Sequence, residues 1–177
     1  FFGTPFLVAR FEQPHRELVV EARSTVEVTR RAPDPEAPAE SWEAAAASAL
    51  ASHELGPESP AHFIYPSPLV RLVDEVADYA RTSFQVGRSA LSGAAELMRR
   101  IRADFEYEPE ATDVTTPLAQ AFAQRRGVCQ DFAHVMISGL RGLGVPARYV
   151  SGYIRTAPLD DPPRLEGADA SHAWVEV

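Results

Sequence analysis

The chain has 177 residues, of which 45% are hydrophobic and 24% are charged, and its formal net charge is −8. This composition is typical of a folded globular protein with one main domain. The acidic balance argues against nucleic acid as a partner, because an extended phosphate-binding surface needs clustered lysine and arginine. We find no stretch of about 20 apolar residues that would span a membrane, so no membrane partner is expected.

The first 30 residues have the pattern of antiparallel β structure. Polar and apolar side chains alternate over residues 17–29, which predicts one half-buried strand, or two strands joined by a bulge near Ser24. Residues 6–11 predict another short strand. The next ten residues hold three prolines among acidic residues and predict an extended linker. The predicted organisation is a partial β region (1–30), a linker (31–40) and a C-terminally incomplete core (41–177).

Helical periodicity dominates the first part of the core. Ser41 and Thr116 are expected to be N-caps of the first and last of these helices, because their hydroxyl groups can accept from orphan backbone N–H groups. The predicted helices cover residues 41–55, 69–80, 91–105 and 117–124.

A fifth helix is predicted from Cys129 to about residue 143, where Gly144 and Pro146 stop it. Residues 147–154 and 170–177 read as two strands, joined by a loop rich in proline and aspartate over residues 156–169. This order of elements predicts an α+β fold in which the helix packs on an antiparallel sheet.

Cys129 is the only cysteine in the chain, so it cannot form an intrachain disulfide. At a helix start it would meet unpaired N–H groups and the positive end of the helix dipole, which favour a thiolate. A cysteine nucleophile also needs a base within reach, and His172 is the candidate. In the predicted strand, Trp174 lies on the same face as His172 and would shield the pair from water.

Cys129, Asp131 and His134 share one predicted helix and are the candidate ligands for a metal site. Their spacing does not converge on one face of that helix, and the sequence has no paired-ligand motif, so neither a metal nor a cofactor is expected. Asp131 is expected to cap the helix or to pair with Arg125 or Arg126. His134 is expected to be a hydrogen-bonded structural residue.

Three sequence blocks carry a family resemblance: RGVCQDFAH at 126–134, GVPARYVSGY at 144–153 and SHAWVE at 171–176. In this order and spacing they resemble the transglutaminase-like superfamily of papain-type cysteine enzymes, in its bacterial branch with an N-terminal β region. The resemblance implies a helical core with a central cysteine-bearing helix on an antiparallel sheet, preceded by a small β module.

The resemblance also implies a chemistry. Cys129 would be the nucleophile and His172 the general base, with the N–H of Cys129 in the oxyanion hole. Tyr107, Gln130 and Trp174 are candidates for oxyanion or substrate contacts. The implied reaction is acyl transfer from an amide through a thioester, on a protein or peptide substrate, and hydrolysis is favoured over cross-linking.

The family pattern ends with an aspartate on the strand after the histidine strand, and this sequence ends at Val177 before reaching it. Asp169, three residues before His172, falls on the opposite face of that strand, and Asp160 and Asp161 lie in a loop. We therefore expect this chain alone to be weakly active or inactive. The alternative is a non-catalytic binding or assembly module on the same fold.

Oligomeric state has no signature in this sequence, and compartment has a weak one. A single cysteine suits a reducing compartment and favours the cytoplasm. Because the first residue is Phe1 rather than methionine, an export signal ahead of this segment stays open as an alternative.

Overall fold

The computed structural model describes residues 8–19, 21, 25, 27, 29, 32–153 and 171–177. The described elements confirm the predicted α+β class. The helices are α1 (Trp42–Ala51), the 3-10 helix η1 (Pro60–Phe63), α2 (Asp74–Arg81), α3 (Ala90–Asp104), α4 (Leu118–Gln124) and α5 (Cys129–Gly142). The strands are β1 (Glu106–Tyr107), β2 (Arg126–Gly127), β3 (Arg148–Gly152) and β4 (His172–Glu176).

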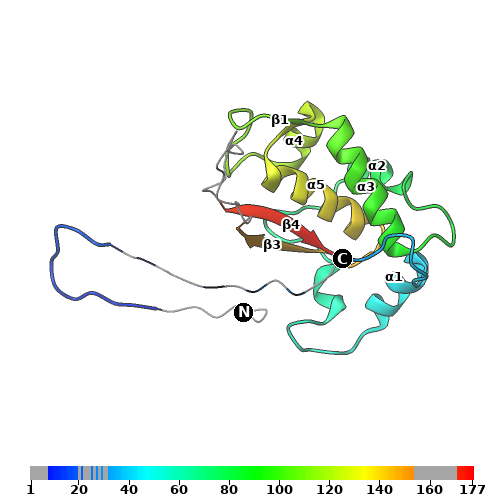
Figure 1. Ribbon diagram of the computed structural model, residues 1–177, viewed down its shortest axis with the longest axis horizontal. Coiled ribbons are helices and arrows are strands. Elements are labelled where there is room, and N and C mark those ends of the chain that lie inside the picture. Colours follow the sequence, from blue (N-terminus) through cyan, green and yellow to red (C-terminus); the bar gives the residue numbers. More distant parts are fainter. Residues whose placement is uncertain are drawn as a thin grey trace.

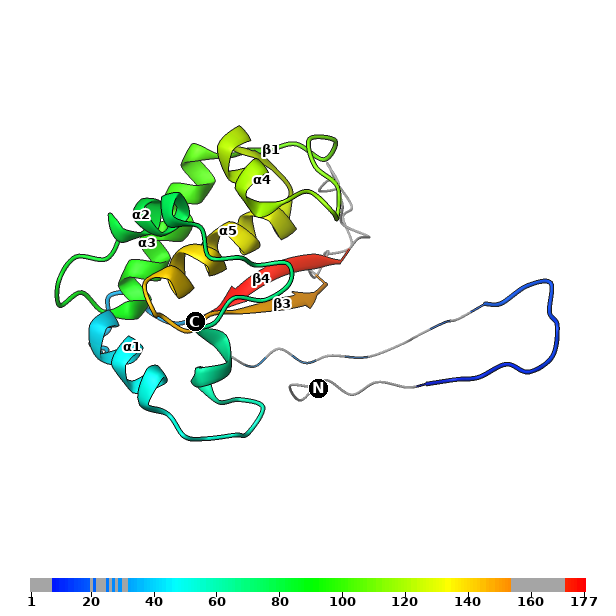
Figure 2. The ribbon, with the colours of Figure 1, turned by 180° about the vertical axis from the view of Figure 1, so that it is seen from behind.

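Helix α5 is the centre of the fold. Figures 1 and 2 show it between the helices α2, α3 and α4 on one side and the β3–β4 hairpin on the other. Most of its residues are buried, including the wholly enclosed Ile137 and Leu140. Burial on nearly all sides is what a central core helix requires, and it holds the start of α5 in a defined place.

The sheet beside α5 is the predicted antiparallel pair of strands. Arg148 of β3 lies opposite Glu176 of β4, and Gly152 lies opposite His172. The guanidinium of Arg148 donates to Glu176 over 2.7 Å and to Glu58 over 2.6 Å. These charge-assisted bonds tie one end of the hairpin to the segment before η1.

Small residues let α2 pack closely on α5. A Cβ atom at Gly139 would lie only 2.7 Å from Cβ of Ala80, and one at Gly142 would lie 2.7 Å from Cβ of Ala77. Real carbon atoms do not approach so closely, so glycine is needed at both positions of α5 for this contact.

A short parallel pairing of β1 with β2 was not predicted. The N–H of Glu106 donates to the carbonyl of Arg125 over 2.8 Å, and the N–H of Glu108 donates to that of Gly127 over 3.0 Å. Two-residue strands have no periodicity of their own, which is why the sequence pattern did not indicate them. The pairing fixes the backbone immediately before α5.

The predicted helix boundaries hold in part. Ser41 caps α1 as expected, since its hydroxyl accepts from the N–H of Ala44. The helix predicted over residues 69–80 begins only at Asp74, because Ser67 and Val70 exchange backbone hydrogen bonds in a turn. The predicted N-cap role of Thr116 is wrong. Its hydroxyl bonds within the preceding turn, and the residue at the cap of α4 is Pro117.

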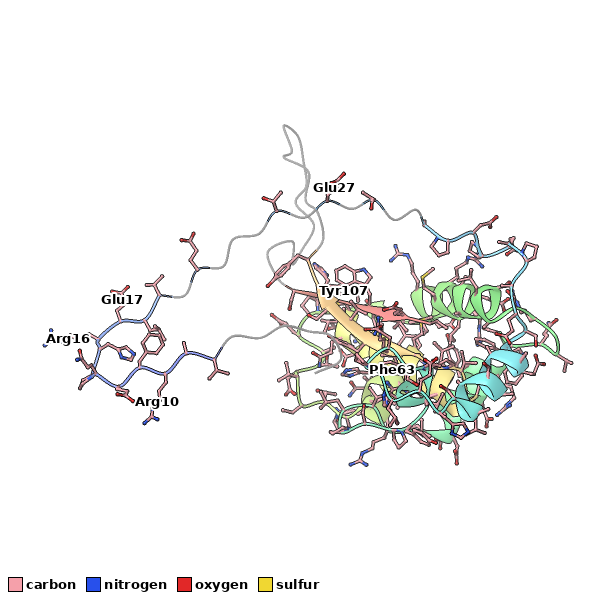
Figure 3. All side chains as sticks on the ribbon, turned by 90° about the horizontal axis from the view of Figure 1, so that it is seen from below. Arg10, Arg16, Glu17, Glu27, Phe63 and Tyr107 are labelled. Atoms are coloured by element: carbon pink, nitrogen blue, oxygen red, sulfur yellow. The ribbon has the colours of Figure 1, made fainter. Side chains whose placement is uncertain are left out.

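The predicted N-terminal β region is only partly covered by the described residues. Residues 8–19 contain no helix or strand, so the strand predicted over residues 6–11 is absent from its described part. A strand needs a hydrogen-bonded partner, and here Val8 and Phe11 are exposed. Figure 3 shows Arg10 and Glu17 on this segment, away from the helical body. Most of the alternating segment 17–29 lies outside the described residues.

Within the described part of the chain, none of the helices combines the length and the apolar character that crossing a membrane would require.

Candidate active site at the start of helix α5

Cys129 is the first residue of α5, as the sequence predicted, and it is half-buried. The residue at the N-cap is Val128, whose side chain has no hydrogen-bond acceptor. The first backbone bond of the helix runs from the N–H of Phe132 to the carbonyl of Val128 over 3.1 Å. Among the described residues, the N–H groups of Cys129 and Gln130 therefore have no hydrogen-bond acceptor.

Asp131 caps the helix from inside, which confirms the predicted capping role. Its Oδ2 atom accepts from the N–H of Val128 over 2.8 Å and from the hydroxyl of Thr112 over 2.6 Å. The residue is 5% exposed. Gly127 leaves space for this carboxylate and has a φ of 153°. The turn before the cysteine is thus held by one buried carboxylate.

The predicted arginine partners of Asp131 are wrong. Arg126 instead pairs with Glu106 over 3.3 Å and with Glu108 over 3.2 Å. Both carboxylates are on or next to β1, the strand paired with β2. Arg126 therefore forms its ion pairs with carboxylates at β1 and not with Asp131.

The Arg125 guanidinium stacks on aromatic rings. It lies 4.0 Å from the ring centre of Phe122 and 4.7 Å from those of Tyr79 and Phe105. This is a cation–π arrangement, and it joins α2, α4 and the residue that follows α3, just before the turn into α5. Arg125 also has a left-handed backbone with φ of 56°.

His172 and Trp174 are both in β4. Their ring centres lie 6.3 Å apart, so the predicted proximity of tryptophan and imidazole is present. Figures 1 and 2 both show the beginning of β4 at the same end of the molecule as the beginning of α5. The fold thus brings the element bearing His172 to the end of α5 that carries Cys129.

A groove of about 570 Å³ runs between α5, α3 and β4. Cys129, Tyr107 and Trp174 line it together, whereas His172 and Gln130 do not. Tyr107, labelled in Figure 3, is half-exposed and makes an edge contact with the ring of Phe132. The rest of the wall is mostly apolar: Met98, Ile101, Arg102, Phe105, Phe132, Ala133, Met136, Ala173 and Val175.

Tyr149 is a neighbour of the cysteine that the sequence analysis did not single out. Burial raises the pKa of Tyr149, and the charge of the Cys129 thiolate raises it further. Its ring centre lies 5.4 Å from that of His134. The only sequence signal was its place in the second family block, because the contact joins β3 to α5.

His134 differs from its prediction. It is 8% exposed, and its ring has no hydrogen bond to any described residue. Burial lowers the pKa of His134, and the nearby carboxylate of Asp131 partly opposes that effect. The imidazole of His134 is buried on α5 and packs against the ring of Tyr149, so its contact is with an aromatic ring and not with a hydrogen-bond partner among the described residues.

The described residues contain no group of three or more histidine, cysteine, aspartate or glutamate side chains that could hold a metal ion. Asp160, Asp161 and Asp169 lie outside the described residues, as does the loop predicted over 156–169.

Comparison with known families is decisive for the fold. Residues 77–177, more than half of the chain, match the model of the transglutaminase-like superfamily. The chain belongs to this superfamily. The match confirms the resemblance that three sequence blocks predicted, and it places the chain in a family of cysteine enzymes.

Several mycobacterial proteins are similar to most of this chain. Uncharacterized proteins of Mycobacterium bovis and Mycobacterium tuberculosis are each 36% identical over 168 residues, which cover 93% of this chain and 52% of the relative. One of Mycobacterium leprae is 30% identical over 180 residues, covering 100% of this chain and 60% of its own. The chain spans about half the length of the curated relatives it matches.

One solved structure is similar to about two thirds of this chain. It is called "a Putative Cysteine Protease from Cytophaga hutchinsonii", and it superposes with a TM-score of 0.53 at 29% sequence identity. The superposition covers 67% of this chain and 38% of the other.

Proposed function

We propose that the chain carries the catalytic cysteine of an acyl-transfer enzyme that acts on amide bonds of proteins or peptides. One observation carries the proposal: Cys129 opens the central helix beside N–H groups that have no acceptor among the described residues, and it lines a groove. Unpaired N–H groups and the helix dipole favour both a thiolate and a developing oxyanion.

In this proposal His172 is the general base. Support comes from its position in the first residue of β4, at the same end of the molecule as the start of α5, and from the tryptophan ring beside it. An imidazole there would take the proton of Cys129, and Trp174 would limit its contact with water. General-base assistance of this kind contributes about 10²–10⁴ in rate.

The proposed reaction has two steps. The sulfur of Cys129 attacks the carbonyl carbon, a C–S bond forms, and the carbonyl electron pair moves to oxygen, where backbone N–H groups stabilise it. The intermediate then expels the amine, which takes a proton from the imidazolium of His172. The acceptor attacks the resulting thioester and regenerates the thiolate.

We propose water as the acceptor, so that the activity is hydrolysis by a peptidase or amidase. The name of the Cytophaga structure supports this choice over amine transfer. In either case the reaction needs no metal and no organic cofactor, because the thiolate and imidazole supply the nucleophile and the proton transfer.

The test is acetylation of the chain by p-nitrophenyl acetate, followed by intact mass and by release of p-nitrophenolate. We expect one acetyl group on Cys129, no acetylation of that site in Cys129→Ala, and a rate about 10²-fold lower in His172→Ala. A chase of the acetylated protein with water, with and without butylamine, distinguishes hydrolysis from transfer. Acetylation no faster than in Cys129→Ala would contradict the proposal and favour a non-catalytic module.

A further inference from the structure

Asp131 is a buried carboxylate two residues after the cysteine. It is 5% exposed and occupies the third position of α5, where a negative charge is favoured by the helix dipole. A carboxyl group so deeply buried needs hydrogen-bond partners. Its partners are therefore informative about its role.

The Oδ2 atom of Asp131 joins the turn before α5 to the segment between β1 and α4. It accepts from the N–H of Val128, 2.8 Å away in the turn before α5, and from the hydroxyl of Thr112, 2.6 Å away in the segment between β1 and α4. A Cβ atom at Gly127 would lie 2.4 Å from the same oxygen. Because Glu108 also bonds the carbonyl of Gly127, that turn is fixed from two sides.

The choice of partner has a consequence for Cys129. A conventional N-cap side chain accepts from the second or third N–H of the helix. Here Val128 has no acceptor, and the carboxylate of Asp131 takes the N–H of Val128 itself. The N–H groups of Cys129 and Gln130 consequently have no acceptor among the described residues, and the turn before them is hydrogen-bonded to Asp131 and Glu108.

Charge alone does not explain this arrangement. A carboxylate near Cys129 opposes formation of a thiolate, since like charges disfavour ionisation. A group that merely activated the thiol would be neutral or positive. A role in holding the N–H groups, however, requires a strong acceptor, and a carboxylate is the strongest that a side chain offers.

We propose that Asp131, supported by Thr112, is a positioning residue that holds the N–H groups of Cys129 and Gln130 in place for the oxyanion. The inference rests on the proposed acyl-transfer function. The proposal predicts different effects on two reactions of the Cys129 thiol, acylation and alkylation. Acylation by an ester passes through a tetrahedral oxyanion and needs these N–H groups, whereas alkylation by iodoacetamide displaces iodide and forms no oxyanion.

The test measures both reactions at the same pH for each variant. Asp131→Asn keeps the shape and removes the charge, and Thr112→Val removes one hydrogen bond of the carboxylate. The probes are p-nitrophenyl acetate, in which a C–S bond forms as p-nitrophenolate leaves, and iodoacetamide, in which a C–S bond forms as iodide leaves.

Two matched controls separate positioning from general loss of packing. Ser138→Ala removes a buried hydroxyl of the same helix, which donates to the carbonyl of Arg71 over 2.7 Å. Thr115→Val changes a hydroxyl in the same segment as Thr112 that bonds Asp113 instead. Neither side chain touches the turn before Cys129.

We expect Asp131→Asn to acylate at least about 10-fold more slowly while its alkylation rate stays the same or rises. Thr112→Val should shift the ratio of the two rates in the same direction by about 3-fold. Both controls should keep the wild-type ratio. If Asp131→Asn fails to fold, the ratio in Thr112→Val decides the matter.

An unchanged ratio in a folded variant would overturn the positioning role. Failure of the proposed function looks different: wild-type protein would then show neither acetylation of Cys129 nor alkylation faster than that of a free thiol. The two failures are distinguishable because one concerns the variants and the other the wild type.

Discussion

Gly127 and Asp131 are so close that a Cβ atom at Gly127 would lie 2.4 Å from Oδ2 of Asp131 and 2.9 Å from its Cγ. The backbone of Gly127, with φ of 153°, also has a conformation that other residues rarely adopt. These two constraints act at the turn that leads into Cys129.

Gly127→Ala is therefore expected to lower the free energy of unfolding by about 2 kcal/mol, measured by urea unfolding. Gly56→Ala is the matched control, because a Cβ atom there meets nothing within 4 Å and its effect should stay within about 0.5 kcal/mol. Equal stability of the two variants would contradict the structure of this turn.

Arg125 and Arg126 are neighbours with opposite environments. Arg125 stacks on three rings, and its Nη1 atom is buried without a hydrogen-bond partner among the described residues. The Arg126 side chain is 54% exposed and makes surface ion pairs. We expect Arg125→Ala to cost about 2 kcal/mol and Arg125→Lys about 1 kcal/mol, because lysine keeps the charge but not the planar stack.

Arg126→Ala provides the comparison, with an expected change of at most about 1 kcal/mol, as for exposed ion pairs. Chemical unfolding of the three variants tests this order. An Arg125→Ala variant as stable as Arg126→Ala would show that the aromatic stack contributes nothing.

His134 predicts a pH dependence of stability. Burial lowers its pKa in the folded chain, whereas the unfolded value is about 6.5. The stability that the neutral His134 contributes is therefore fully present above about pH 6.5. It is lost as the pH falls from there through the lowered pKa of the folded state, because the unfolded state binds the proton more tightly.

Urea unfolding at pH 7.5 and pH 5 should show a larger loss of stability for the wild type than for His134→Leu. The exposed His15, changed to leucine, serves as the control and should lose as much as the wild type. Parallel losses in His134→Leu and the wild type would contradict the account of this buried imidazole.

Local patterns were enough to predict the central helix and the strands beside it. The apolar period of α5, the stop at Gly144 with φ of 82° and the alternation in β4 each depend only on residues that are close in sequence. Three short blocks then predicted the superfamily. Of the predicted site residues, Cys129, Tyr107 and Trp174 line one groove, whereas His172 and Gln130 do not.

The features that were missed depend on segments far apart in sequence. The β1–β2 pairing, the Arg125 stack and the contact of Tyr149 with His134 each join elements that no local pattern links. The apolar periodicity also predicted a helix over residues 69–73, where the structure has a turn closed by backbone hydrogen bonds between Ser67 and Val70, and α2 begins at Asp74. The catalytic roles of Cys129 and His172 stay predictions.

The most direct test of the central claim is the pH profile of iodoacetamide labelling of Cys129, in the wild type and in His172→Ala. His62→Ala, which removes an imidazole from η1, is the control. We expect wild type and control to label well below the ordinary thiol pKa of about 8.5, and His172→Ala to shift the onset upward toward it. Labelling that begins only near pH 8.5 in all three proteins would contradict a thiolate–imidazole pair.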